Sequence, residues 1–219
     1  KAIANSGAYI THSPAVTSVN LSHFFGLYKC QNTSGYCDIV YTNVPISGGI
    51  RGYGNPQAMW VVEQMMDMAA EKLGMDPIEI RLKNLRGTGD PCWVPFIPIE
   101  SWPVGKCIKL GSEKFSWEEK ISASKGDGVK RRGIGVATVG HVSGAFPMLS
   151  EHTNAYIKLN EDGSADLIAS CCEMGQGLLT TLCQIAAEEL GLRLEDISII
   201  NGDTSVTGYD VGQHASRSV

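Results

Sequence analysis

The strongest pattern along the chain is a run of apolar residues at helical spacing between residues 57 and 74. Asn55 can cap this helix, Pro56 fits its first turn because a missing N–H costs nothing there, and Gly74 can end it in a left-handed conformation. One narrow stripe is polar, formed by Glu63, Gln64, Asp67 and Glu71. The pattern therefore predicts a helix buried on most sides, with its methionines in the core.

A second, shorter helix is predicted directly after the first. Asp76 can cap it, Pro77 takes its first position and Glu79 its third, and the helix runs to about Leu85. Three further segments follow: a proline-rich ordered loop at 88–110, a short helix at 111–124 and a basic surface linker at 125–132.

Extended segments flank these helices. Aromatic and β-branched residues between turn signals predict strands at 21–29 and 37–42, and residues 133–139 alternate small and β-branched side chains. The C-terminal part predicts a hairpin of residues 155–159 and 165–170, a helix at 178–190 closed by Gly191, and a strand at 197–200. Because helices and strands do not alternate strictly, the predicted class is α+β, with mixed sheets packed against helices.

Composition limits what such a chain can be. Its 219 residues, 23.5 kDa, suffice for one large domain or two small ones with a buried core. Apolar residues make up 43% and charged residues 19%, with a net charge of −5, which argues against disorder and against nucleic-acid binding. No segment has the roughly 20 apolar residues that cross a bilayer, so no membrane contact is expected.

The cysteines indicate the compartment. Seven cysteines, an odd number without the spacing of a disulfide framework, indicate reduced thiols and a cytoplasmic protein. No Cys-x-x-Cys pair occurs and the five histidines lack ligand spacing, so the chain is not expected to ligate a metal or an iron–sulfur cluster directly. The first residues read as the interior of a protein, which predicts that the chain is a fragment.

Glycine is the unusual component, with 25 of the 219 residues where about 7% is typical. One cluster, at residues 47–57, leads directly into the first predicted helix. Its glycines allow positive φ angles and close approach of a ligand to main-chain N–H groups. Arg51 offers a fixed fork of donors to an oxyanion, and Tyr53 offers a ring face for stacking. A tight turn with Arg51 in a surface salt bridge explains the same residues equally well.

Two further segments carry candidate chemistry. At residues 171–177 a strand runs through glycines into a helix N-terminus, where backbone N–H groups favour an anion and Gln176 is an amide donor. A plain strand-to-helix turn also explains this segment. Residues 214–218 gather small hydroxyl residues and one cation, donors suited to phosphate or pterin edges, although a surface loop fits them too. His141, flanked by glycines, is the histidine that we single out.

Four motifs, in this order, resemble the large molybdopterin-binding subunit of the molybdenum hydroxylases, the xanthine dehydrogenase and aldehyde oxidase family. They are residues 49–57, residues 73–84, residues 173–191, and the pair formed by 203–204 and 215–218. The resemblance implies a molybdenum-cofactor-binding fold with two sub-regions. Residues 1–125 would belong to the first cofactor-binding region and residues 130–219 to the start of the second, in a fragment of a larger subunit.

The resemblance also implies roles for single residues. Arg51 would be the catalytic residue, lying beside the molybdenum and orienting substrate or stabilising charge on it. Tyr53 would stack on a flat substrate, and His141, where the family varies with substrate, is counted as substrate-binding with it. The residues expected to hold the cofactor are Gly49, Ile50, Gly52, Gly175, Gln176, Gly177, Thr180, Ala215, Ser216, Arg217 and Ser218.

The implied activity is that of a molybdopterin-dependent oxidoreductase, which inserts oxygen from water into a C–H bond of an N-heterocycle or an aldehyde. The cofactor would be molybdopterin or its cytosine dinucleotide form, and electrons would pass to 2Fe–2S and FAD centres on other subunits or domains. The family's catalytic glutamate is not recognisable in this sequence, so this segment alone is expected to be inactive. Two alternatives stay open: reductive dehydroxylation as in 4-hydroxybenzoyl-CoA reductase, and a non-catalytic remnant that serves in assembly.

Overall fold

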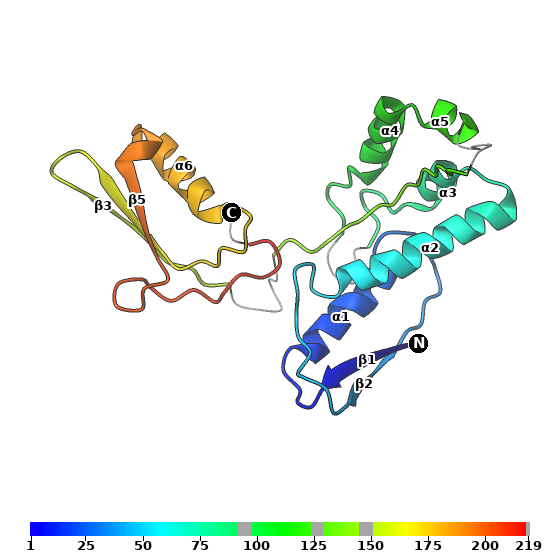
Figure 1. The fold of residues 1–219 in the computed structure, drawn as a ribbon, viewed down its shortest axis with the longest axis horizontal. Coiled ribbons are helices and arrows are strands. Elements are labelled where there is room, and N and C mark those ends of the chain that lie inside the picture. The colour runs from blue at the N-terminus through cyan, green and yellow to red at the C-terminus, as the bar shows by residue number, and fades with distance from the viewer. Residues whose placement is uncertain (92–97, 124–128, 145–150, 218–219) are drawn as a thin grey trace. The chain divides into compact units, whose positions relative to one another are not determined.

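The computed structural model describes residues 1–91, 98–123, 129–144 and 151–217. The chain folds as two compact units, residues 1–141 and residues 142–219 (Figure 1). Each unit combines helices and strands, which confirms the predicted α+β class. The boundary expected at 125–130 refers to cofactor-binding regions and stays a prediction, whereas the compact units divide after His141.

The first unit begins with a β–α–β arrangement (Figure 1). β1 (Ala2–Gly7) and β2 (Cys37–Tyr41) form a two-stranded parallel sheet, and α1 (Ser13–Phe24) connects them and packs against both. Parallel neighbours need such a crossover because both strands start at the same end of the sheet. The predicted strand at 37–42 is therefore confirmed.

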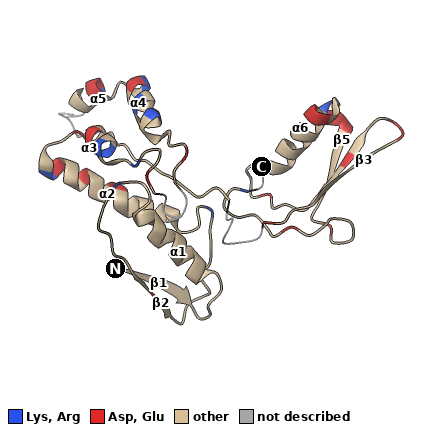
Figure 2. Cartoon of the chain, turned by 180° about the vertical axis from the view of Figure 1, so that it is seen from behind, with Lys and Arg blue, Asp and Glu red and all other residues tan. Residues whose placement is uncertain are grey.

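The predicted strand at 21–29 is wrong, because its first residues form the end of α1. This helix buries Ser13, Thr17 and His23 rather than an apolar stripe, and it contains no charged residue (Figure 2). A helix without separate apolar and polar faces leaves no helical period in the sequence. The need for a crossover between two parallel strands decides the conformation instead.

The helix α2 (Asn55–Leu73) confirms the predicted long helix, with Pro56 in its first turn and Gly74 in a left-handed conformation at its end. The prediction that Asn55 caps this helix is wrong. The N-cap is Gly54, with a φ of 89°, and no side chain caps the first turn. Asn55 is buried, and its side chain bonds to another part of the unit.

The predicted burial of α2 is also wrong, because its polar stripe does not face water. Glu63 is 5% exposed, and its Oε2 accepts from Nε of Arg81 at 2.8 Å. Arg81 lies on α3 (Pro77–Asn84), is fully buried, and also donates to Oδ1 of Asp67 at 2.8 Å. A buried guanidinium needs such carboxylate partners. The apolar residues left outside are Trp60, Met65, Met68 and Leu73.

Two distant residues complete this buried polar network. The hydroxyl of Tyr28 donates to Oε1 of Glu63 at 2.5 Å, and the N–H of Thr138 donates to Oε2 at 2.9 Å. Burial and the hydrogen bond to Glu63 raise the pKa of Tyr28 above its usual range. The network thus joins α2 and α3 to the chain segments around residues 28 and 138.

The cap of α3 is confirmed, since Oδ1 of Asp76 accepts from the N–H groups of Ile78 and Glu79 at 2.7 and 3.1 Å. The other oxygen, Oδ2, accepts from Nε1 of Trp117 at 2.8 Å. Ile78, Ile108 and Trp117 form a small buried cluster, and residues 134 and 136 of the extended segment pack against it. This cluster holds the third, fourth and fifth helices of the unit together.

The region between α3 and the unit boundary differs from the prediction. α4 (Val104–Phe115) begins inside the expected loop at 88–110, and α5 (Trp117–Ala123) follows it after Ser116, so the helix expected at 111–124 is two helices. Ser116 has a φ of 56°, and such a left-handed residue interrupts a helix. Much of the linker expected at 125–132 lies outside the described residues.

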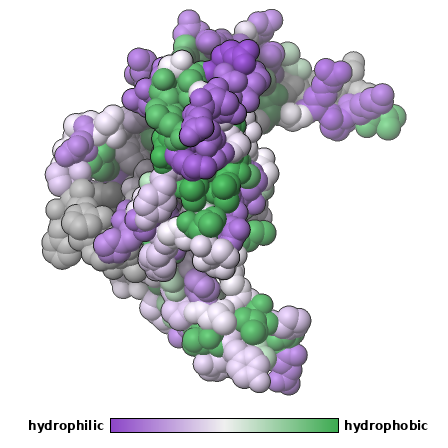
Figure 3. Space-filling view, turned by 90° about the vertical axis from the view of Figure 1, so that its left-hand side faces the viewer, coloured by the Kyte–Doolittle hydropathy of each residue, from purple (hydrophilic) through white to green (hydrophobic). Residues whose placement is uncertain are grey.

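The second unit contains a three-stranded sheet in the order β3–β4–β5. β3 (Ala155–Leu159) and β4 (Ala165–Ala169) form the predicted antiparallel hairpin, and β5 (Ile197–Asn201) lies parallel to β4. α6 (Leu178–Leu190) crosses from β4 to β5, so the predicted hairpin, helix and last strand are confirmed. β4 buries alternate residues, while other apolar side chains reach the surface of the molecule (Figure 3).

No helix of the described part of the chain is long and apolar enough to cross a membrane. Six cysteines lie in the described residues, and all six are free thiols: Cys30, Cys37, Cys107, Cys171, Cys172 and Cys183.

Candidate functional site

The glycine-rich loop before α2 contains three successive left-handed residues. Gly52, Tyr53 and Gly54 have φ angles of 92°, 46° and 89°. Only glycine fits at position 54, because a Cβ there would lie 2.4 Å from the carbonyl oxygen of Val16 in α1. The N–H of Tyr53 donates to the carbonyl of Ile50 at 2.7 Å, which tightens the turn. The loop is therefore a fixed structure that closes against α1.

The same loop leaves its hydrogen-bond donors unused. The N–H groups of residues 48–52 donate to no described residue. Arg51 is exposed, and its guanidinium pairs with no carboxylate in the described ranges, so the interpretation as a surface salt bridge finds no partner there. A run of free amides beside a free guanidinium can bind an anionic, oxygen-rich ligand.

Tyr53 is held in place by two contacts. Its hydroxyl lies 2.9 Å from Nδ1 of His12, and the two rings meet edge to face. Its ring also packs on Gly49, where a Cβ would lie 2.3 Å from Cε2. Burial raises the pKa of Tyr53. Sequence reasoning missed His12, because 41 residues separate the pair and no local motif connects them.

His141 lies next to a residue that this loop binds. The Asn55 side chain donates from Nδ2 to the carbonyl oxygen of Gly140 at 2.8 Å. The His141 ring is 5.4 Å from that of His23, and burial lowers the pKa of both. In the first unit the structure thus connects the segment before His141 to the loop that carries Arg51 and Tyr53.

The second glycine loop, before α6, is bound to itself. Oε1 of Glu173 accepts from the N–H groups of Gly175 and Gly177 at 2.6 and 3.0 Å, and Oε2 accepts from Leu179 at 3.3 Å. These bonds, that from Gly177 first, lower the pKa of Glu173. The sequence predicted an anion at these amides, and a carboxylate of the chain itself occupies them. The available signal was an acidic residue just before a helix N-terminus.

Gln176 is also engaged within this loop. Its Nε2 donates to the carbonyl of Cys172 at 3.0 Å, and its Oε1 accepts from the N–H of Met174 at 2.6 Å. Thr180 is exposed in the first turn of α6. The cofactor contacts predicted for Gly175, Gln176, Gly177 and Thr180 stay predictions.

The C-terminal candidate segment contains two strained residues, Ala215 and Ser216, with φ angles of 47° and 57°. The carbonyl of Ala215 accepts from the N–H of Gly144 at 2.6 Å. The N–H groups of residues 213–216 donate to no residue that the structure describes. Non-glycine residues in this conformation are costly and concentrate at binding sites.

Arg217 serves the second unit itself. Its guanidinium donates to Oδ1 of Asp210 at 3.0 Å and to the carbonyl oxygens of Gly212 and His152, both at 3.1 Å. Its charge is therefore neutralised within the unit, and its side chain is 9% exposed. The last predicted cofactor residue, Ser218, lies outside the described residues.

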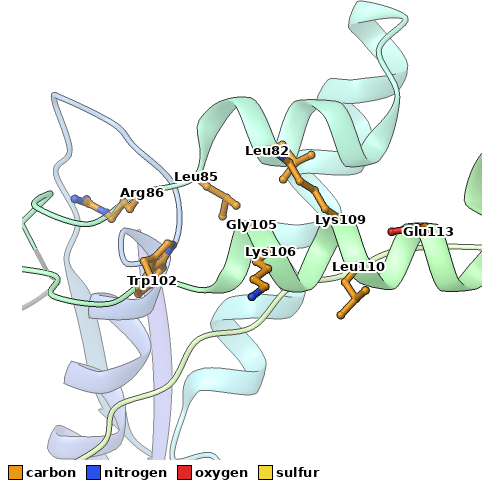
Figure 4. A pocket seen from close by; sticks show the side chains of 9 residues that line it. All are labelled: Leu82, Leu85, Arg86, Trp102, Gly105, Lys106, Lys109, Leu110 and Glu113. Carbon is orange, nitrogen blue, oxygen red and sulfur yellow. The ribbon is translucent and has the colours of Figure 1, made fainter.

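The largest groove of the first unit contains none of the predicted site residues. It has a volume of about 670 Å³ and lies between α3 and α4 (Figure 4). Leu82 and Leu85 line one side, and Lys106, Lys109 and Leu110 of α4 line the other. Within the described ranges, no group of three or more His, Cys, Asp and Glu could hold a metal ion.

Comparison with known proteins identifies the fold. Family profiles described as molybdopterin cofactor-binding domains match residues 1–85 and 110–219. The xanthine dehydrogenase molybdenum-binding subunit of Escherichia coli O157:H7 is 36% identical over 217 residues, which are 98% of this chain and 29% of that protein. A probable subunit of the xanthine dehydrogenase of Bacillus subtilis is 32% identical over 219 residues, 99% of this chain and 29% of that protein.

Solved structures agree with these relatives. The aldehyde oxidoreductase of Desulfovibrio desulfuricans matches 99% of this chain and 24% of its own, with a TM-score of 0.80 and 29% identity. Quinoline 2-oxidoreductase of Pseudomonas putida matches 98% of this chain and 29% of its own, with a TM-score of 0.81 and 26% identity. The chain therefore belongs to the molybdopterin cofactor-binding family found in the large subunits of molybdenum hydroxylases. It spans less than a third of the length of these relatives.

Proposed function

We propose that this chain is part of the catalytic subunit of a molybdenum-dependent hydroxylase or dehydrogenase. The enzyme would insert oxygen from water into a C–H bond of an N-heterocycle or an aldehyde. One observation carries the proposal: within a chain of this family, the loop before α2 keeps five amides and the Arg51 guanidinium unused by any described residue. A loop kept only for its shape has no need of free donors.

The donors present fit an anionic pterin. In the first unit, Gly49, Ile50 and Gly52 would offer backbone N–H groups to the cofactor. In the second, Gln176, Thr180 and the run from Ala215 to Ser218 would hold it. Because the Arg217 charge is neutralised by Asp210, this run would act through its backbone and the Ser216 hydroxyl. When bound, the molybdenum cofactor supplies the oxidation of the C–H bond and takes up two electrons.

Substrate positioning would fall to the first unit. The fixed ring of Tyr53 offers a face to a flat heterocycle. Arg51 would donate to a carbonyl or ring nitrogen of the substrate and stabilise the negative charge that develops there. His141 would contribute to substrate contact beside this loop. Relatives named for xanthine and quinoline support a heterocyclic substrate.

Electrons would leave through 2Fe–2S and FAD centres on other subunits or domains. One relative, at 28% identity, is named as subunit gamma of the 6-hydroxypseudooxynicotine dehydrogenase complex of Paenarthrobacter nicotinovorans, which supports a multi-subunit assembly. The cofactor would be molybdopterin or its cytosine dinucleotide form. The free cysteines support a cytoplasmic location.

Metal and pterin analysis of the full-length protein, expressed with its partner subunits, tests this proposal. We expect molybdenum and pterin in near-equal amounts, and Arg51→Ala should lower turnover at least tenfold while cofactor content stays near normal. Arg132→Ala, which removes another exposed cation, is the matched control and should leave both unchanged. Absence of both molybdenum and pterin would favour the non-catalytic remnant and refute the proposal.

A further inference from the structure

The two glycine loops treat their backbone donors in opposite ways. In the loop before α2, the N–H groups of residues 48–52 are unused within the described chain. In the loop before α6, Gly175, Gly177 and Leu179 all donate to the carboxylate of Glu173. The positive end of α6 is therefore neutralised by a side chain of the same loop, and a phosphate would have to displace it.

This closure determines what the second loop can offer to a ligand. The Gln176 amide carries two N–H donors and an oxygen with two lone pairs. Cys172 and Met174 use one donor and one lone pair. One N–H and one lone pair of Gln176 therefore remain, and they are held in a fixed orientation by the bonds that the other atoms make.

The loop is fixed at both ends. At its start, the N–H of Cys171 donates to Oδ1 of Asn201 at 2.8 Å, and Nδ2 of Asn201 donates back to the carbonyl of Cys171 at 3.0 Å. At its end, Glu173 ties the loop to the first turn of α6. Between these two anchors Gly175 and Gly177 adopt φ angles of 95° and 79°, which let the chain fold back over the carboxylate.

We infer that Glu173 is the positioning residue of Gln176: its carboxylate fills the N-terminus of α6, so that the loop presents the Gln176 amide, and not its backbone N–H groups, to the cofactor. This inference rests on the proposed function. It assigns to Gly175 and Gly177 a conformational role in the loop.

A double-mutant cycle on the full-length protein tests the inference. Glu173→Ala and Gln176→Ala should each lower pterin content by about tenfold, the loss expected for a hydrogen bond of about 1.4 kcal/mol. Because Glu173 acts through Gln176, the double variant should lose no more than Gln176→Ala alone. Glu189→Ala removes the same charge from the exposed side of α6 and should leave pterin content unchanged. Losses that multiply in the double variant would overturn the inference.

Hydrogen exchange on cofactor-free protein gives a second readout. The amides of Gly175, Gly177 and Leu179 should be protected in the parent protein and exchange at least tenfold faster in Glu173→Ala. Glu173→Gln keeps Oε1 as an acceptor for two of these amides, so it should retain most of the protection. Inorganic phosphate should not protect the amides of the parent protein further; protection by phosphate would show an anion site and contradict the inference. A parent protein without any pterin would instead refute the proposed function.

Discussion

The side chain of Asn55 joins two segments that lie 85 residues apart, because its Nδ2 donates to the carbonyl oxygen of Gly140 at 2.8 Å. Asn55 is 3% exposed and directly follows the loop of Arg51 and Tyr53. Gly140 directly precedes His141. A residue that the sequence presents as a helix cap therefore connects the candidate catalytic loop to a candidate substrate-binding residue.

Replacing Asn55 should loosen this connection. Asn55→Ala leaves the Gly140 carbonyl without its donor, and we expect a loss of about 1 to 3 kcal/mol in the free energy of unfolding. Asn55→Asp places a carboxylate against a carbonyl oxygen and should cost at least as much. The four tryptophans all precede residue 142, so urea unfolding followed by tryptophan fluorescence reports on the first unit. Gln57→Ala, at an exposed position in the same helical turn, is the control, and equal losses in Asn55→Ala and Gln57→Ala would contradict this account.

Glycine is required at position 54 and not at position 48. In Gly54→Ala the new Cβ would lie 2.4 Å from the Val16 carbonyl oxygen at a φ of 89°, so α1 and the loop must separate. We expect a loss of about 1 to 3 kcal/mol from overpacking and backbone strain. Gly48→Ala meets no atom within 4 Å and should change stability by less than about 0.5 kcal/mol. Urea midpoints of the two variants measure the difference, and equal midpoints would show that the loop does not close on α1.

The ring of Tyr53 should matter more than its hydroxyl. Tyr53→Phe loses the bond to His12 but keeps the stacking face, so KM for a heterocyclic substrate should stay within about twofold. Tyr53→Ala loses the face, and KM should rise about tenfold, which corresponds to about 1.4 kcal/mol of binding. Steady-state kinetics of the complete enzyme, with molybdenum content as the reference for active sites, test this. A KM that rises equally in both variants would assign the effect to the hydrogen bond.

Features decided within a few residues of one another could be predicted from sequence. Asp76 caps α3 because its donors are two and three residues away, and Gly74 ends α2 through its own φ angle. The hairpin of β3 and β4 follows from a short turn between alternating segments. The order of four motifs also sufficed to find the family. In each case the information lies inside one short window of sequence.

Features decided by distant partners could not be predicted. Glu63 is buried because Arg81, 18 residues later, and Thr138, 75 residues later, bind its carboxylate. α1 is a helix because two parallel strands need a crossover. The role of Glu173 is an intermediate case, since its carboxylate oxygens bind amides within six residues and an acidic residue at a helix start is a readable signal. There the glycines drew attention away from the carboxylate.

The buried pair of Glu63 and Arg81 should dominate the stability of the first unit. Arg81→Met removes the cation and leaves Glu63 buried without its partner, which should cost about 3 to 5 kcal/mol. Asp67→Asn weakens a partner whose side chain is 44% exposed, and should cost less than about 1 kcal/mol. Tryptophan fluorescence in urea measures both variants. An Arg81→Met protein as stable as the parent would mean that apolar packing replaces the pair, as happens in some buried ion pairs when the whole network is substituted.

The first unit should lose stability in mild acid, because burial lowers the pKa of His23 and of His141 below the ordinary value of 6.5. The unfolded chain therefore binds more protons than the folded one at pH values just below 6.5. Stability is then fully present above pH 6.5 and falls as the pH drops through 6.5 toward the lower pKa values of the folded state. The two rings lie 5.4 Å apart, so protonation of both also places like charges together.

Urea midpoints from tryptophan fluorescence between pH 5.5 and pH 7.5 measure this loss, in a range where carboxylates stay largely ionised. We expect the midpoint of the parent protein to fall on the acid side of pH 6.5. The double variant His23→Gln with His141→Gln should show a lower midpoint at pH 7.5, because the hydrogen bond between the His23 ring and the Val19 carbonyl is lost, but a flatter dependence on pH. His152→Gln changes a histidine of the second unit and should keep the full slope. A double variant with the parent's slope would place the titrating groups elsewhere in the unit.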